Sequence, residues 1–70
     1  MTQLDDIRLE LAELEALRLC DLEGLDQEPA GQRMGVSRGT VQRLLQSGRA
    51  KVVAALVSPS ALIIEAESQA

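Results

Sequence analysis

Apolar residues recur along the chain at spacings that predict three helices and two short strands. Residues 7–9 alternate between apolar and polar side chains, which is the spacing of a β-strand. Residues 11–22 are rich in good helix formers, and Gly24 is the expected end of this first helix. Apolar positions occupy most of its circumference, so we expect neighbours to pack against several of its sides.

The middle of the sequence predicts two helices joined by a tight turn. Asp26 is a candidate N-cap for a helix over residues 27–34. Gly35 is expected to end that helix, and Ser37 to cap a third helix over residues 38–57. A helix, a short turn containing glycine and a second capped helix form the layout of a helix-turn-helix.

The third predicted helix changes character along its length. One stripe is apolar throughout and is expected to face the core: Val41, Leu44, Leu45, Gly48, Val52, Ala55 and Leu56. In the first half, the opposite side carries Gly39, Gln42, Arg43 and Gln46. In the second half, that side carries Ala50, Val53, Ala54 and Val57. A chain of this size has too little material to cover both sides of the apolar end, so a partner subunit is expected there.

The end of the sequence predicts a second strand. Ser58-Pro59-Ser60 interrupts the helical pattern, and residues 61–65 are typical of a β-branched strand. Two strands alone are marginally stable, so we expect residues 7–9 and 61–65 to pair, within or between chains, over the packed helices. The predicted fold is mainly α, with one helix-turn-helix domain over residues 1–70 and short strands near both ends.

Small size favours self-association. A core of this size rarely supplies more than about 3–5 kcal/mol without disulfides, a metal or a partner chain. Cys20 is the only cysteine and the chain has no histidine, so we expect neither an internal disulfide nor a zinc site. A homodimer or higher oligomer remains, and its predicted interface is formed by Val53, Ala54, Val57, Leu62 and Ile64.

Composition also argues against several classes of function. The chain has no aromatic residue on which unpaired bases could stack, which weighs against binding of RNA or single-stranded DNA. No apolar run approaches the roughly 18 residues of a membrane helix, and no signal peptide follows Met1. Cys20 is interpreted as a small buried hydrophobic residue. We expect a cytoplasmic protein that is not an enzyme and has no cofactor, metal or membrane partner.

The net charge of −4 conceals a division between two parts of the chain. Residues 1–28 carry nine carboxylates and two arginines, whereas residues 29–64 carry five basic residues and no acid. DNA affinity depends on the local cationic surface, although an ordinary solvated face would show the same pattern. Four acids are interpreted as solvent-exposed residues between the apolar positions of the first helix rather than as a cation site: Glu13, Glu15, Asp21 and Glu23.

The segment QEPAGQRMGVSRGTVQRLLQSGR, residues 27–49, closely resembles the helix-turn-helix of sigma-factor region four. Its pattern is met in order by Gln27, Gly31, Gly35, Val36 and Ser37, with apolar positions at Ala30, Met34, Val41 and Leu44. The resemblance implies that the two helices cross closely at Gly31. Glycine there lowers helix propensity by about 1 kcal/mol relative to alanine.

From about Leu9 to Glu65 the chain resembles a family of small prokaryotic proteins of unknown function that are predicted to bind DNA. Members usually carry a cysteine-containing segment before this region, and some carry a further domain after it. We expect any metal or redox sensing by those parts not to extend to this chain. At Pro29, Gly31 and Gly39 the chain departs from better helix formers, so a less stable module is expected.

In this motif the second helix lies in the major groove and its first residues meet base edges. The implied base-reading residues are Arg38, Gln42, Arg43 and Gln46, since arginine pairs with guanine and glutamine with adenine. The implied phosphate contacts are Gln27, Arg33, Ser37, Thr40, Arg49 and Lys51. The alternative is that Ser37 is only a cap and the arginines only a solvated face.

The sequence therefore predicts a homodimeric, sequence-specific binder of double-stranded DNA that regulates transcription. One continuous third helix would rigidly couple the subunit interface to the reading residues. Two alternatives stay open. The first is a protein-interaction module that docks on transcription machinery with weak DNA contact. The second is a dimerisation fragment that has lost DNA binding because of Pro29 and Gly39.

Overall fold

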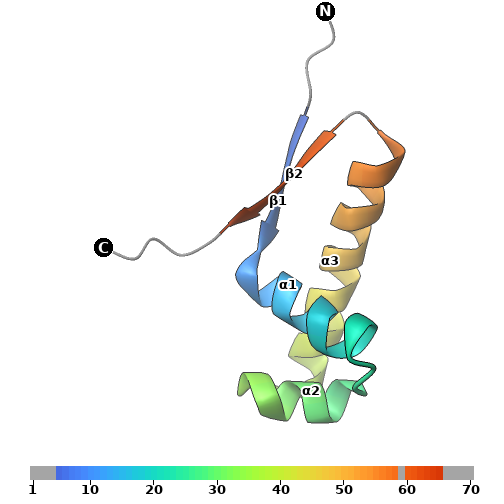
Figure 1. Cartoon of the computed structure of the whole chain (residues 1–70). Helices are drawn as coiled ribbons and strands as arrows, with labels where there is room; N and C mark the ends of the chain where they lie inside the picture. The colour runs from blue at the N-terminus through green and yellow to red at the C-terminus, as the bar shows by residue number, and fades with distance from the viewer. Residues whose placement is uncertain (1–4, 59, 66–70) are drawn as a thin grey trace, which may run out of the picture.

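The computed structural model describes residues 5–58 and 60–65. In chain order the elements are β1 (Asp5–Glu10), α1 (Leu11–Leu17), the π-helical turn η1 (Arg18–Leu22), α2 (Gln27–Met34), α3 (Arg38–Val57) and β2 (Ser60–Glu65) (Figure 1). The predicted mainly helical fold with three helices and two terminal strands is confirmed. Pro59, in the predicted break before β2, lies outside the described residues.

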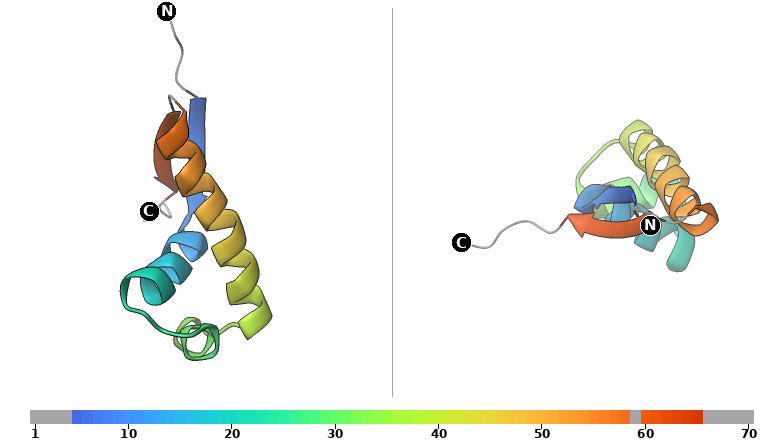
Figure 2. Two further views of the ribbon diagram at one scale, coloured as in Figure 1. Left: turned by 90° about the vertical axis from the view of Figure 1, so that its right-hand side faces the viewer. Right: turned by 90° about the horizontal axis from the view of Figure 1, so that it is seen from above.

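The two strands form a parallel sheet within one chain. Asp5 is the register partner of Ser60, and Glu10 that of Glu65. Parallel strands require a long crossover connection, and here the crossover contains all the helices. Figures 1 and 2 show α3 rising beside the sheet, with α2 across the opposite end of α3. The sheet thus joins both ends of the helical unit and leaves α2 and the start of α3 far from the strands.

Every helix contributes to a small apolar core. The buried apolar side chains are Leu9, Ala16, Leu19, Ala30, Val41 and Leu45. On α3, Val41, Leu45 and Gly48 are buried as predicted. Leu56 was expected on the same core stripe and is instead 80% exposed. That prediction is wrong because α1 contacts α3 at Gly48, leaving the last turn of α3 to project beyond α1 (Figure 1).

The turn between α2 and α3 has the predicted geometry. Gly35 has a φ of 74°, in the left-handed region that favours glycine, and ends α2. The Ser37 hydroxyl accepts a hydrogen bond from the Thr40 N–H at 3.1 Å and caps α3. Asp26 occupies the N-cap position of α2, but its side chain makes no cap hydrogen bond and lines a groove beside η1 instead. The predicted Asp26 side-chain cap is therefore wrong.

Gly31 is the point of closest approach between α2 and the turn. A Cβ atom added there would lie 2.7 Å from the carbonyl oxygen of Val36. The Val36 N–H in turn donates to the Gly31 carbonyl at 2.9 Å. The expected close contact at Gly31 is confirmed, but its partner is the backbone of the turn rather than the crossing helix.

A buried carboxylate joins α1 to α3 where the two helices cross. A Cβ atom on Gly48 would lie 3.4 Å from the Glu13 Cβ, and Glu13 is 3% exposed. Its Oε2 accepts from Ser47 Oγ at 2.5 Å, and its Oε1 from Lys51 Nζ at 2.8 Å and the Glu10 N–H at 2.9 Å. The interpretation of Glu13 as a solvent-exposed residue is wrong. The close crossing at Gly48 supplies hydrogen-bond donors that satisfy the buried carboxylate.

Opposing effects set the pKa of Glu13. Burial raises the pKa because it disfavours the charged form, whereas the hydrogen bonds from Lys51, Ser47 and the Glu10 backbone, with the positive charge of Lys51, lower it. The net result is a pKa below the ordinary value. A carboxyl group of this kind stabilises the fold above its unfolded-state pKa and loses that contribution as the pH falls through its folded-state pKa.

Glu13→Gln is expected to lower the free energy of unfolding at pH 7 by about 1–3 kcal/mol, because an amide cannot match the hydrogen bonds of the buried carboxylate. The difference from wild type should narrow as the pH falls below 4.5, the ordinary glutamate pKa, because the unfolded chain binds a proton there first and folded Glu13 does so only at its lower pKa. Urea unfolding followed by circular dichroism between pH 7 and pH 3 measures both effects. Glu15→Gln, on the exposed side of the same helix, is the control. Equal losses for both variants would contradict the account.

Two glycine substitutions should have opposite effects on stability. Gly31→Val is expected to lower the free energy of unfolding by about 1–3 kcal/mol, because the new side chain meets the Val36 carbonyl. Gly39→Ala should raise it by up to about 1 kcal/mol, since the nearest atom to an added Cβ is Ser37 Oγ at 3.9 Å. Thermal unfolding of the two variants beside wild type checks both signs. A Gly31→Val variant as stable as wild type would contradict the contact.

Candidate nucleic-acid interface

The predicted base-reading residues are brought together on the first half of α3. All four are exposed: Arg38, Gln42, Arg43 and Gln46. Within residues 5–58 and 60–65, neither Arg38 nor Arg43 forms an ion pair with a carboxylate. The surface therefore presents two guanidinium groups and two amides, the groups that bind guanine and adenine edges in a major groove.

The start of α2 extends this surface. Gln27, Gln42, Leu45, Gln46 and Arg49 line a shallow hollow. An adjoining open groove is lined by Gln27, Arg38 and Arg49, and also by Asp21, Asp26 and Glu28. Gln27 thus lies beside two of the predicted base-reading residues, Gln42 and Gln46, and its phosphate contact stays a prediction. The acids of the adjoining groove would repel a phosphate on its η1 side.

Arg49, a predicted phosphate contact, is held in an ion pair with Asp21. Its Nε and Nη2 donate to the two carboxylate oxygens of Asp21 at 3.0 and 2.7 Å. These hydrogen bonds lower the pKa of Asp21 and raise that of Arg49. The sequence did not predict this pairing, because Asp21 lies 28 positions before Arg49 and only the folding of the chain brings the two together.

Lys51, another predicted phosphate contact, faces α1. Its ammonium donates to the buried carboxylate of Glu13, and its side chain is 32% exposed. This hydrogen bond raises the pKa of Lys51 above its ordinary value. The structure therefore does not bring Lys51 to the candidate surface.

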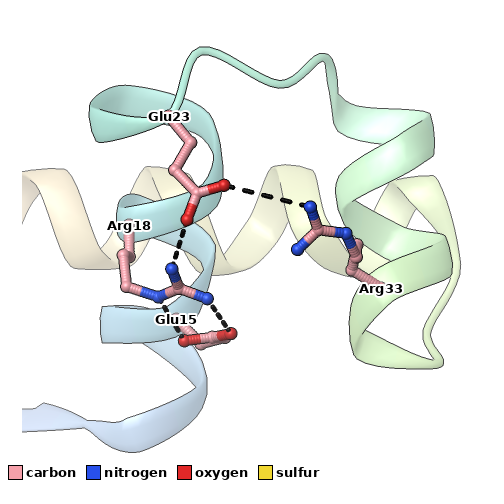
Figure 3. A network of polar contacts seen from close by, with 4 residues as sticks. All are labelled: Glu15, Arg18, Glu23 and Arg33. Carbon is pink, nitrogen blue, oxygen red and sulfur yellow. Dashed lines mark hydrogen bonds and ion pairs between the residues drawn. The ribbon is translucent and has the colours of Figure 1, made fainter.

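Arg33 belongs to a network that links α1, η1 and α2 (Figure 3). Arg18 donates to both carboxylate oxygens of Glu15 at 2.9 and 2.7 Å, and also pairs with Glu23. The other oxygen of Glu23 lies 4.0 Å from Arg33 Nη2. These pairs are exposed and contribute little net stability. The Arg33 side chain stays 59% exposed, so the network leaves it accessible to a phosphate.

Ser37 and Thr40 bind each other at the start of α3. Besides capping the helix, the Ser37 hydroxyl donates to Thr40 Oγ1 at 3.0 Å. Arg43 Nη2 also donates to Thr40 Oγ1, at 3.3 Å. The capping role of Ser37 is confirmed, whereas phosphate contacts by Ser37 and Thr40 stay predictions. The hydroxyl pair orients Arg43 along the first turn of the helix.

The predicted subunit interface is uncovered in the single chain. Ala54 is half-buried, and the other predicted residues have exposed fractions of 55% for Val53, 77% for Val57, 39% for Leu62 and 49% for Ile64. Leu62 and Ile64 are register partners of Ile7 and Leu9, so they share the sheet face that carries buried Leu9. Contact between subunits at these residues stays a prediction.

Cys20 lies at the wall of the groove beside η1 and is half-buried, packed against the core. Burial raises its thiol pKa, and the negative charge of Asp21 adds to this effect. The thiol of Cys20 therefore ionises less readily than that of a free cysteine. In the described ranges, no cluster of three cysteine or carboxylate side chains is suited to a metal ion. None of the described helices has the length and apolarity needed to span a bilayer.

Comparisons with known proteins identify relatives that carry the name UPF0251 protein. A UPF0251 protein of Thermococcus kodakarensis is 67% identical over 52 residues, covering 74% of this chain and 46% of its own length. UPF0251 proteins of Desulforudis audaxviator and Thermoanaerobacter pseudethanolicus are 52% and 49% identical, covering 89% and 93% of this chain. The chain spans 40% and 55% of these two relatives. No solved structure matches it. The family model of the protein of unknown function DUF134 matches residues 1–69, and the chain therefore belongs to that family.

Proposed function

We propose that this chain binds duplex DNA sequence-specifically through α2 and α3 and regulates transcription. One observation carries the proposal: the first half of α3 exposes two arginines and two glutamines directly after a capped turn. Among the described residues, both arginines, Arg38 and Arg43, lack a carboxylate partner. Groups that read base edges are thus free on the element that enters the groove in motifs of this type.

The turn supports the proposal because it fixes how α2 and α3 approach DNA together. Contact between Gly31 and the Val36 carbonyl holds α2 close to the start of α3. With α3 in the major groove, α2 crosses the DNA backbone, and Gln27 and Arg33 meet phosphates. Such contacts set the register of the protein on the duplex, whereas the side chains of α3 select the sequence.

The distribution of paired charges favours one direction of approach. Glu15 lies on α1, Asp21 on η1 and Glu23 directly after η1, and all three are paired with arginines. A phosphate backbone gains nothing from that side, where it would compete with carboxylates for each guanidinium. DNA therefore approaches the exposed side of α3, and a homodimer would carry two such reading surfaces.

Arg43→Ala is expected to weaken binding to a selected site and to relax specificity at one base pair by about 1–3 kcal/mol, because one bidentate base contact is lost. Selection of bound fragments from sheared genomic DNA, followed by gel retardation at several salt concentrations, measures the effect. Arg8→Ala is the matched control, since Arg8 is exposed on β1, away from α2. Equal losses in the two variants, or no retardation of any fragment by wild type at low salt, would reject the proposal.

Asp21→Asn is expected to strengthen DNA binding. The change removes a negative charge near the groove and releases Arg49 for a phosphate, so the slope of log affinity against log salt should steepen by about 0.9. Glu15→Gln makes the same charge change at a pair that lacks a candidate contact residue, and should leave the slope unaltered. If both variants bind alike, release of Arg49 is not the cause.

A second candidate function is docking on transcription machinery with weak DNA contact. The observation that favours it is the exposed apolar end of α3, where Leu56 and Val57 are 80% and 77% exposed. Recovery of a stoichiometric protein partner, together with no selection among DNA fragments, would support this candidate over DNA reading.

A further inference from the structure

The last turns of α3 expose an apolar stripe without charge. Val53, Leu56 and Val57 are 55%, 80% and 77% exposed, and their spacing places them on one side of the helix. We call these three residues the α3 seam. After Arg49, Lys51 is the one charged residue of α3, and its ammonium binds Glu13 on the α1 side.

The α3 seam continues the side of the helix that carries the reading residues. Val53 follows Gln46 by seven positions, and Val57 follows Arg43 by fourteen. Because a straight helix drifts by about 20° in seven residues, each seam residue lies within about 40° of its reading residue around the axis. A single exposed stripe is therefore polar and basic at the start of α3 and apolar at its end.

We propose that a second copy of this chain docks antiparallel on the α3 seam, and that the two reading surfaces of the dimer face separate duplex segments. The second part rests on the proposed function. A two-fold interface brings a patch against itself, so its occupant must be compatible with an identical surface. With the axis between Val53 and Val57, apolar side chains meet apolar side chains.

Charge favours a second copy over a charged partner. The charged residues of α3 nearest to the seam are already neutralised: Arg49, which lines a hollow together with Val53, pairs with Asp21, and Lys51 pairs with Glu13. Arg43 lies fourteen positions before Val57, so the antiparallel arrangement keeps the like charges of the two reading surfaces well apart. A charged partner would lose hydration against the seam without gaining an ion pair there.

The shared side of α3 determines where the reading surfaces point. In a two-fold dimer each seam points at its partner, so the two seams point in opposite directions. The reading residues follow the same stripe, and their two surfaces therefore point in opposite directions as well. At about 1.5 Å per residue, Gln42 lies roughly 20 Å from the middle of the seam, beyond the end of the partner's α3. Each surface stays open, and one side of a straight duplex cannot meet both.

Leu56→Glu tests the docking surface. Wild type should be a dimer by light scattering, and the variant a monomer with unchanged helicity, since the replaced side chain is 80% exposed. Leu22→Glu is the matched control, because Leu22 is 79% exposed at the end of η1 and outside the seam. A monomeric wild type, or equal dissociation by both variants, would overturn the proposal.

Cysteine pairs test the orientation. In a Cys20→Ser background, Val53→Cys and Val57→Cys chains are mixed and oxidised. The antiparallel seam predicts that the mixed disulfide between the two variants forms faster than either symmetric one. Faster symmetric disulfides would indicate parallel helices and would overturn the arrangement.

A two-duplex assay tests the direction of the reading surfaces. Protein bound to an immobilised duplex of a selected fragment should capture a second, fluorescent copy of that duplex, whereas Leu56→Glu should bind the first duplex and capture none. A dimer that binds one palindromic duplex and captures no other would overturn the proposal. An intact dimer that binds no DNA would reject the proposed function but not the docking of two chains on the α3 seam. A monomer that binds DNA would support the proposed function and reject the docking of two chains on the α3 seam.

Discussion

The crossing of α1 and α3 at Gly48 depends on one buried carboxylate. Glu13 lies where a charge is costly, and its donors come from the residue before Gly48, from the turn after it and from the start of α1. A shift of α3 along α1 would leave the carboxylate without these partners. The hydrogen bonds of Glu13 therefore fix one register between α1 and α3, and with it the positions of all the side chains of α3.

That register divides α3 into two halves whose exposed sides differ in chemistry. Before Ser47 the exposed side bears the proposed base-reading residues, and after Lys51 it bears the α3 seam. The same packing decides which basic residues are free. Arg8, Arg18, Arg33, Arg49 and Lys51 all have a carboxylate within ion-pair distance. Within the part of the chain that the structure describes, Arg38 and Arg43 are the two that do not. A chain of net negative charge thus concentrates its unpaired positive charge on one helix turn and the next.

Local signals in the sequence predicted much of the fold. Apolar spacing identified the helices, and Gly35 and Ser37 identified the turn, because a left-handed glycine and a side-chain cap depend on neighbouring residues alone. The strands were found, but their parallel pairing in one chain was left open, since it depends on where the helices return the chain. The exposure of Gln42, Arg43 and Gln46 also followed from spacing, whereas their contact with bases stays a prediction.

Contacts between distant positions were not predictable in the same way. Glu13 and Lys51 are 38 positions apart, and Asp21 and Arg49 are 28 apart, so no spacing rule connects them. The sequence therefore suggested solvated acids and free phosphate contacts where packing makes ion pairs. The predicted burial of Leu56 was wrong for a related reason. Its spacing matches the core stripe, but the last turn of α3 extends beyond α1, which would have to cover it.

The most direct measurement of which surface meets DNA is a titration of the isotopically labelled protein with a selected duplex, followed by backbone amide chemical shifts. The account predicts that the largest changes fall between Arg38 and Gln46, with smaller ones at Gln27 and Arg33, and that α1 and β1 change little. Largest changes on the acidic side of α1 and η1, or no saturable change anywhere, would contradict it.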